Sequence, residues 1–470
     1  MVRRIWIPVT IMLLFIALRS YHIGAPLLDH SDWRQSDTAS ITRFYYLDGI
    51  NLLRPQVLYD GPGPNYIQAE FPIGEALTAE LAHVVGWSNT LLHSVAIGLS
   101  AISLIALYLL LHQEFGASVA AWGALFYALS PLAIFFGRAV QPEPAMMCFG
   151  LLALWLFSAW AHRPSGGRLL LACLAFALAI LAKLPNAILG LPILFFLLRR
   201  FSWKRPGQWV WPLGLPYIPA ILYTAAAGLG ATGQGDFVTR ILIALFTQPG
   251  WQEGTSAITA FWRHNLLAGV AGWGMALAAP LGLLVCDRRG RIWMAAWGFA
   301  LLIWCVVVVS RIRQDYYLLI CVPWFAATAG IAMEWLWRTK RAVLAPIASV
   351  VAVGLIVLSA VQFLPPLYRL DEGTQVLAQA MDRVCPSGPV VVGTENPALL
   401  YAAWRHGWRT SVVGARSLGA WLAEGATLVV PLGASITREG QAWLTTHARR
   451  LTDSEGSVLY VLDDCRTTTA

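Results

Sequence analysis

The sequence has very little charge for its length. Only 12% of its 470 residues are Asp, Glu, Lys or Arg, whereas 57% are hydrophobic. A soluble domain needs roughly a quarter of its residues charged to cover its surface. The shortage therefore excludes a soluble globular chain and predicts a polytopic membrane protein. The net charge of +8 fits this class, because membrane proteins collect Lys and Arg in their cytoplasmic loops.

Several sequence signals are missing as well. No small-residue cleavage pattern follows the first apolar segment, so we expect an uncleaved anchor. No Gly-rich nucleotide-binding loop is visible, which favours a lipid-linked over a nucleotide-linked substrate. His22 and His30 lie near acids, but no spacing is typical of a metal site. We therefore predict no cofactor, with a divalent metal as the less favoured alternative, and no nucleic-acid partner.

Eleven apolar segments have lengths that suit membrane spans. They lie at about residues 5–21, 89–111, 117–136, 143–161, 168–183, 185–198, 208–228, 265–286, 291–310, 316–337 and 342–363. With the N-terminus in the cytoplasm, four of the five inner loops are strongly basic and only HQEFG is not. The prediction is a multi-pass protein of the inner (plasma) membrane with an extracytoplasmic, periplasmic C-terminal tail.

The tail has a different pattern from the rest of the chain. In VVVGTENPALLYAAWRHGW, ATLVVPL and GSVLYVLDD, short β-branched runs alternate with helical patterns. This predicts a small α/β domain over residues 364–470. Residues 1–363 are then the α-helical transmembrane domain, with a long first outer loop at about 22–88.

Polar residues gather at the outward-facing ends of the predicted spans. Charged groups at membrane depth are costly and usually functional. Arg311 and Arg313 are notable because they lie outside, against the positive-inside rule. The full set is Asp32, Arg34, Gln35, Asp37, Glu70, Arg138, Glu143, Lys183, Arg311, Arg313, Asp315, Tyr316 and Tyr317. Such a set predicts a site for an anionic, partly buried substrate.

These motifs resemble those of the GT-C glycosyltransferases. In particular, they resemble the group that uses dolichyl- or polyprenyl-phosphate sugars, which includes protein O-mannosyltransferases of glycosyltransferase family 39 and lipid A aminoarabinose transferases. The matching segments run in the family's order: HSDWRQSDTASITRFYYLDGINLLRP, EFPIGEAL, GRAVQPE, AKLPNAILGLP, RQDYYLLICVPW and a soluble tail. The resemblance covers nearly the whole chain. WRQSDTA differs from the adjacent D-E pair of better-known members, so the catalytic acid is left open.

The resemblance implies transfer of a sugar from a polyprenyl phosphate to a glycan, glycolipid or protein of the cell envelope. Lipopolysaccharide is one such acceptor, and membrane lipids are the other expected partners. Cations must stabilise the leaving phosphate, and one carboxylate must take the acceptor's proton in an inverting displacement. We favour Asp37 as the base, with Asp32 and Glu143 as alternatives. The expected phosphate clamp is Arg138, Lys183, Arg311 and Arg313, lined by Tyr316 and Tyr317. Arg34, Gln35, Glu70 and Asp315 are expected to bind substrate.

Each of these residues also has a purely structural interpretation. Asp37 suits a helix N-cap, and Asp32 a loop acid paired with Arg34. Glu143 suits the N-terminal dipole of the fourth span, and Lys183 a side chain that reaches the interface. Arg311 and Arg313 suit anionic headgroups. A transporter or lipid flippase, and a noncatalytic subunit, are the alternative functions; a transporter would place its ionisable groups nearer mid-bilayer.

The seven cysteines fall into two groups. Five lie in apolar spans and are expected to be packing residues. Cys385 and Cys465 lie in the tail and flank its apparent first and last strands. On an oxidising side of the membrane such a pair tends to form a disulfide, provided that its Cα atoms lie within about 7 Å. We predict this disulfide, with two unrelated thiols as the alternative.

Overall fold

The computed structural model describes residues 6–232, 243, 247, 255–339, 343–452 and 456–462. The chain forms two compact units, each built from separate stretches of sequence. Unit 1 comprises Met1–Gly24, Thr90–Thr224 and Arg240–Tyr368. Unit 2 comprises Ala25–Asn89, Ala225–Thr239 and Arg369–Ala470. The first outer loop thus shares a compact unit with the tail, and the boundary predicted at residue 363 falls inside a helix.

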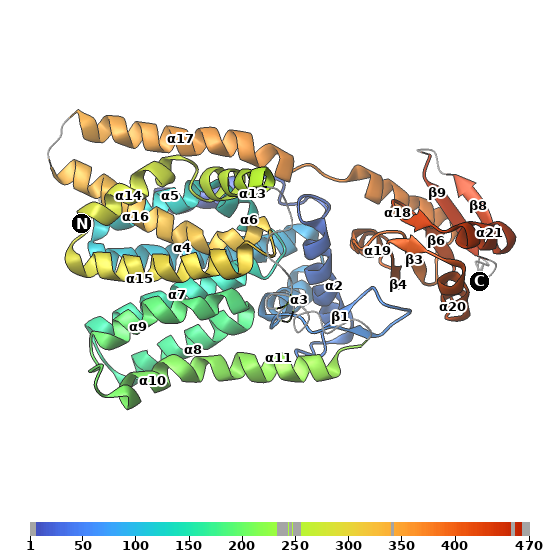
Figure 1. The fold of residues 1–470 in the computed structure, drawn as a ribbon, viewed down its shortest axis with the longest axis horizontal. Helices are drawn as coiled ribbons and strands as arrows, with labels where there is room; N and C mark the ends of the chain where they lie inside the picture. The colour runs from blue at the N-terminus through green and yellow to red at the C-terminus, as the bar shows by residue number, and fades with distance from the viewer. Residues whose placement is uncertain are drawn as a thin grey trace. The chain divides into compact units, whose positions relative to one another are not determined.

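Unit 1 is helical, and its long helices run roughly side by side (Figure 1). The helices built mainly from this unit are α1 (Trp6–Arg19), α4 (Asn89–Phe115), α5 (Ala117–Leu129), α6 (Pro131–Phe136), α7 (Glu143–His162), α8 (Gly166–Ala182), α9 (Gly190–Leu198), α10 (Pro206–Gly214), α11 (Ile218–Gly230), α13 (Thr255–Phe261), α14 (Gly274–Val285), α15 (Arg288–Trp304), α16 (Val322–Arg338) and α17 (Leu344–Leu367). Short 3-10 segments, η2 (Leu184–Leu189), η3 (Leu215–Tyr217) and η6 (Asp315–Cys321), and π-helical segments, η4 (Trp262–Val270) and η5 (Cys305–Val309), connect or extend them.

Six helical segments in the described part of the chain are long and apolar enough to cross a membrane. They are Asn89–Phe115, Glu143–His162, Pro206–Gly230, Arg288–Val309, Asp315–Arg338 and Leu344–Val384. A helix pair bent by 78°, Ser256–Val270 with Gly274–Val285, raises the number to seven if it counts as one span. The chain is therefore a multi-pass membrane protein. The predicted count of eleven is not confirmed, because four of the predicted segments form apolar helices of only 10–17 residues.

Close helix packing in unit 1 depends on small residues. A Cβ atom on Gly330 of α16 would lie 2.9 Å from the backbone nitrogen of Gly123 in α5. A Cβ atom on Gly282 of α14 would lie 1.9 Å from the carbonyl oxygen of Thr328 in α16. Helices in a membrane associate through such close backbone contact rather than through burial of apolar surface. α16 is thus packed tightly on two sides.

Unit 2 contains a five-stranded sheet in the order β4-β3-β6-β9-β8 (red and orange in Figure 1). Its strands are β3 (Val390–Val392), β4 (Gly407–Arg409), β6 (Leu428–Val430), β8 (Ala448–Thr452) and β9 (Val458–Leu462). β3 pairs in parallel with β4 and β6, and β9 is antiparallel to β6 and β8. Two-stranded sheets join β1 (Gln56–Val57) to β2 (Asn65–Tyr66) and β5 (Val412–Val413) to β7 (Ser435–Ile436). The helices are α2 (Asp32–Asp48), α3 (Ile73–Val85), α18 (Glu372–Val384), α19 (Ala398–Ala403), α20 (Ala415–Ala423) and α21 (Arg438–His447).

The segment predicted to be the first outer loop packs against this sheet through one hydrophobic core. Ile41 and Phe44 of α2 share a buried cluster with Val390 and Val392 of β3. The segment after β1 also pairs with the sheet edge, because the Gly407 N–H of β4 donates to the Leu58 carbonyl at 2.9 Å. The start of α2 is held near the carboxyl end of β3, because the side chain of Asn396 in the loop after β3 donates to Asp32 at the start of this helix. Polar residues from distant parts of the sequence meet there.

The cysteines differ in their bonding. Cys148, Cys173, Cys286, Cys305 and Cys321 are free, and all lie in unit 1. Cys385 is disulfide-bonded. Cys465 lies outside the described residues, so the pairing of Cys385 with Cys465 stays a prediction.

Candidate functional site

A buried ion pair links two helices of unit 1. Lys183 directly follows α8, and Glu143 is the first residue of α7. The Lys183 ammonium contacts Glu143 Oε1, and the two side chains are only 4% and 0% exposed. Glu143 Oε2 has no hydrogen-bond partner among the described residues. A buried charge is costly unless it is paired, so each member of the pair is needed to keep the other in place.

Two tyrosines complete the surroundings of the Lys183 ammonium. Its Nζ atom lies 4.9 Å from the ring centre of Tyr316 and 5.3 Å from that of Tyr317. Both tyrosines belong to η6, and their rings meet at 4.8 Å. An ammonium near the face of an aromatic ring is stabilised by the ring's electrons. The structure therefore brings together four of the predicted site residues from three separate segments.

Arg138 lies in the turn after α6 and is fully buried. Its guanidinium donates to the His22 carbonyl at 3.3 Å and lies 4.7 Å from the ring centre of Tyr368. The neighbouring Phe136 meets Tyr316 edge-on at 6.0 Å. Arg138 and Lys183 thus lie in one aromatic environment within unit 1.

A mostly apolar cavity of about 740 Å³ adjoins Tyr368. Leu18 of α1, Ile134 of α6 and Val361 of α17 are among its apolar lining residues. His22 and Tyr368, which both contact Arg138, line it too. Small-molecule sites are typically apolar hollows of ~300–1,000 Å³ with a few polar groups. The cavity suits an apolar chain whose charged end reaches toward Arg138.

The remaining predicted residues of unit 1 lie in the segment between η5 and α16. Arg311 is exposed, and its guanidinium donates to the Val307 carbonyl one turn earlier at 3.1 Å. It therefore caps the end of its own helix. The Asp315 carboxylate accepts from the Tyr316 N–H at 2.9 Å and so begins η6. Arg313 is half-buried.

A second polar cluster lies in unit 2, at the start of α2. Arg34 forms an ion pair with Glu70. The Gln35 amide donates to Asp29 at 2.6 Å. α2 begins at Asp32 and its N-cap is Ser31, so Asp37 lies in the second turn of the helix. The N-cap interpretation of Asp37 is therefore wrong.

Asp32 is held by a residue of the C-terminal tail. The side-chain amide of Asn396 donates to both carboxylate oxygens of Asp32, at 3.1 and 3.0 Å. The Trp33 N–H donates to the same carboxylate at 2.7 Å. Burial raises the pKa of Asp32, and these two hydrogen bonds act in the opposite direction. Both oxygens of Asp32 are therefore engaged.

Asp37 is more deeply buried, at 4% exposure. Burial raises its pKa from 3.8 to about 6, although Arg34, Arg409 and the Tyr59 hydroxyl all favour the charged form. Its Oδ1 atom has no hydrogen-bond partner within the described ranges. A carboxylate with a pKa near neutrality and an available oxygen is suited to accept a proton.

Four residues of the unit 2 cluster were missed by the sequence analysis: Asp29, Tyr59, Asn396 and Arg409. Asn396 follows β3, and Arg409 ends β4. Polar residues at the carboxyl ends of parallel strands are a recognised signal for sites in α/β sheets. The run VVVGTEN carried that signal, but the sequence did not show that α2 would lie against this edge.

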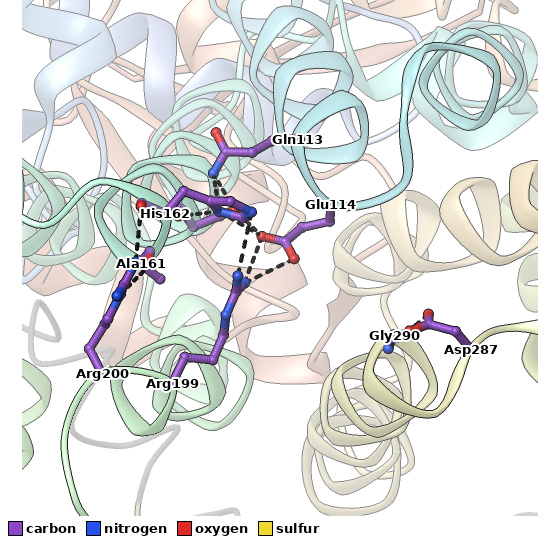
Figure 2. A network of polar contacts seen from close by, with 9 residues as sticks. Gln113, Glu114, Ala161, His162, Arg199, Arg200, Asp287 and Gly290 are labelled. Atoms are coloured by element: carbon purple, nitrogen blue, oxygen red, sulfur yellow. Dashed lines mark hydrogen bonds and ion pairs between the residues drawn. The ribbon is translucent and has the colours of Figure 1, made fainter.

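A separate polar network lies at the other end of α7 (Figure 2). The Arg199 guanidinium donates to both oxygens of Glu114, at 2.9 and 3.0 Å. Ser158 also donates to Glu114, and His162 Nδ1 lies 3.5 Å from it. α7 has 20 residues, so roughly 30 Å separate this network from Glu143. HQEFG, the predicted inner loop that is not basic, thus contributes Glu114 to a pair with Arg199 of a neighbouring basic segment.

No group of three or more His, Cys, Asp or Glu side chains in the described part of the chain is placed to hold a metal ion. The prediction that no metal takes part is not tested by this observation.

Comparison with known proteins identifies the fold. Residues 71–225 match the family model for dolichyl-phosphate-mannose-protein mannosyltransferase. No curated protein matches the chain by sequence.

Solved structures match nearly the whole chain. The structure of ArnT from Cupriavidus metallidurans bound to undecaprenyl phosphate has a TM-score of 0.66 and 13% identity, over 99% of this chain and 98% of that one. The Archaeoglobus fulgidus oligosaccharyltransferase with zinc and sulfate has a TM-score of 0.62 and 12% identity, over 97% and 73%. The archaeal oligosaccharyltransferase AglB from Archaeoglobus fulgidus, with an inhibitory peptide and a dolichol-phosphate, has a TM-score of 0.61 and 12% identity, over 98% and 74%. The predicted resemblance to the GT-C glycosyltransferases is confirmed.

Proposed function

We propose that the chain is an inverting glycosyltransferase of the inner (plasma) membrane. It moves a sugar from a polyprenyl-phosphate donor to an envelope glycan, lipid or protein on the outer face. The observation that carries this proposal is the buried ammonium of Lys183, held between Glu143 and two tyrosines. The shared fold with a protein whose structure contains undecaprenyl phosphate supports the choice of donor.

The donor phosphate is assigned to the cations of unit 1. When the sugar leaves, negative charge develops on the phosphate, and preorganised cations in a dry site lower that barrier. Lys183 and Arg138 are both buried and fixed by their neighbours. The apolar cavity beside Tyr368 suits the start of the polyprenyl chain. Arg311 and Arg313 are the weaker members of the predicted clamp.

The general base is assigned to Asp37. The acceptor hydroxyl gives its proton to the Asp37 carboxylate while its oxygen attacks the anomeric carbon. The bond from that carbon to the phosphate oxygen breaks, and the phosphate leaves with the electron pair. Asp32 and Glu143 are the alternatives, but the Asp32 oxygens are engaged by Asn396, and Glu143 is paired with Lys183. A single displacement inverts the anomeric centre and needs one base.

Substrate contacts, or support of the acids, are assigned to Arg34, Gln35, Glu70 and Asp315. The tail and the first outer loop are assigned to the periplasmic side, with the N-terminus in the cytoplasm. No metal or other cofactor is included in the mechanism. Chelation of divalent ions before assay tests this point, and a loss of turnover restored by one metal would refute it.

The first test is lipid binding, because it needs no knowledge of the sugar. Purified protein is mixed with undecaprenyl phosphate or with undecaprenol, and binding is measured by native mass spectrometry. We expect binding of the phosphate only, reduced at least tenfold in a variant that replaces Lys183.

The second test is transfer. The protein is reconstituted in proteoliposomes with a panel of radiolabelled undecaprenyl-phosphate sugars and envelope extract as acceptor. Label should move to the acceptor in the native protein and not in Asp37→Asn. A flippase would instead move the intact lipid between leaflets without transfer, and that result would replace the proposal.

A further inference from the structure

We propose that two residues of the C-terminal tail, Asn396 and Arg409, are positioning residues for the acids of α2. Asn396 fixes the carboxylate of Asp32, and Arg409 acts with Tyr59 to orient and stabilise the carboxylate of Asp37. The link to catalysis rests on the proposed function, whereas the contacts themselves do not. The tail then supplies part of the surroundings of both Asp32 and Asp37.

Asn396 is locked in one orientation. Its N–H donates to Thr394 Oγ1 at 3.1 Å, and its side-chain oxygen accepts from the Ala398 N–H at 2.9 Å. The second contact fixes which end of the amide is the oxygen, so the NH₂ group must face Asp32. An amide held this way keeps the Asp32 carboxylate in a single rotamer.

Arg409 covers the residue that contacts Asp37. Its guanidinium lies 3.4 Å from the ring centre of Tyr59 and donates to the Glu395 carbonyl at 2.8 Å. Burial raises the pKa of Tyr59 well above its usual value, so its hydroxyl remains a donor to Asp37. Arg409 also lies 3.9 Å from the Asp60 carboxylate, so it packs over Tyr59 and adds to Asp37 a positive charge that it shares with Asp60.

Both arrangements involve the loop that follows β3. Glu395 and Asn396 lie in the loop that follows β3, and Arg409 ends the neighbouring parallel strand β4. Val392, the last residue of β3, pairs with Arg409 in the sheet. The sheet register therefore sets both contacts together. Pairing of β3 with β4 thus places the Asn396 amide on Asp32 and the Arg409 guanidinium over Tyr59, whose hydroxyl contacts Asp37.

Four groups face Asp37 and influence its charge. Arg34, Arg409 and Tyr59 favour the ionised form, and Glu70 opposes it. Arg34 is already ion-paired with Glu70, so its charge is shared. Loss of Arg409 leaves Asp37 buried with less compensation and should raise its pKa by about one unit.

The test reads each carboxylate directly. Dicyclohexylcarbodiimide reacts with protonated carboxyl groups, so labelling of full-length protein across a pH series gives a midpoint for each acid. Trypsin separates the two acids, because cleavage after Arg34 leaves Gln35–Arg43 with Asp37 as its sole acid. Asp32 falls in the preceding peptide and is located there by fragmentation.

Three test variants, one conservative replacement and two controls make the outcome specific. Arg409→Gln and Tyr59→Phe should raise the midpoint of Asp37 by about one unit without moving that of Asp32, and Arg409→Lys should restore it. Asn396→Ala should raise the midpoint of Asp32 alone. The exposed residues Arg416 and Gln379 supply matched controls, Arg416→Gln and Gln379→Ala, which should shift neither acid.

Unchanged midpoints in Arg409→Gln, Tyr59→Phe and Asn396→Ala would overturn the positioning roles, as would equal shifts in the controls. If Arg409→Gln fails to fold, Tyr59→Phe and Arg409→Lys still decide the Asp37 arm. Turnover of undecaprenyl-phosphate sugars is measured in parallel on the same variants. Shifted midpoints with no turnover in the native protein would refute the proposed function but support the positioning roles. Shifted midpoints with native-like turnover in every variant would overturn the catalytic link.

Discussion

Glu143 and Lys183 are separated by 40 residues in the chain, yet their side chains form an almost fully buried ion pair. Each is costly to bury alone, and together they leave the ammonium facing Tyr316 and Tyr317. Under the proposed function, this ammonium is one of the cations that contact the donor phosphate.

The first prediction concerns this pair. Lys183→Met alone should destabilise the protein by about 3–5 kcal/mol, because it leaves the Glu143 carboxylate buried without a partner. The double variant Lys183→Met/Glu143→Gln should recover most of that stability but still bind undecaprenyl phosphate at least tenfold more weakly. Thermal unfolding and native mass spectrometry measure the two effects. Arg311→Ala is the comparison and should weaken binding less; native-like binding by the double variant would remove Lys183 from the clamp.

The second prediction concerns the base. Asp37→Asn keeps the shape of the side chain but cannot accept a proton, so turnover should fall about 10²–10⁴-fold. Binding of undecaprenyl phosphate should be retained, since Asp37 is not assigned to the phosphate. Transfer of labelled sugar in proteoliposomes measures the loss. Turnover within a few-fold of the native protein would eliminate Asp37, and Asp32→Asn would then be the next variant to assay.

The third prediction concerns pH. The base must be ionised, and the pKa of Asp37 is raised to about 6 by burial. The apparent kcat/KM should therefore rise with pH through about 6 and level off above it. At lower pH the carboxyl group is already protonated and cannot accept the proton of the attacking hydroxyl. Initial rates at acceptor concentrations well below KM, measured across this range, give the midpoint. A rate that stays flat down to pH ~4 would point to an acid with an ordinary pKa instead.

The fourth prediction concerns the network at the other end of α7. Glu114→Ala leaves the Arg199 guanidinium half-buried without its carboxylate and should destabilise the protein by about 2–4 kcal/mol. Replacing both residues by Leu should restore much of the loss, since an apolar pair of similar volume needs no counter-charge. Thermal unfolding of the single and double variants tests this. Donor binding by the folded double variant should match the native protein, because the network lies far from Lys183.

The fifth prediction concerns the tail cysteines. Cys385 is disulfide-bonded, and we expect Cys465 to be its partner. In denatured, unreduced protein neither thiol should react with a maleimide, whereas both should react after reduction. The five free cysteines of unit 1 should react in both samples and serve as the internal standard. Labelling of Cys465 without reductant would contradict its pairing with Cys385.

Much of the fold followed from composition and order of motifs. A chain with 12% charged residues must hide most of its backbone in helices within a lipid phase, so its class was predictable. Motif order alone was enough to indicate the GT-C resemblance. The number of spans could not be predicted in the same way. Four apolar helices of 10–17 residues, α5 and α8 among them, give the hydropathy pattern of full spans but are shorter than the usual spanning length.

The candidate site divides in the same way. The sequence by itself determined which residue types carry the chemistry, because charges in an apolar chain stand out, and it singled out Asp32, Asp37, Glu143 and Lys183 individually. Only the tertiary structure decided their partners. Packing of α2 against the sheet brings Asn396 and Arg409 to Asp32 and Asp37 across more than 360 residues of chain. Hydrophobic periodicity describes which face of an element is buried, but it holds no information on which distant element covers that face, and the properties of both acids follow from what covers them.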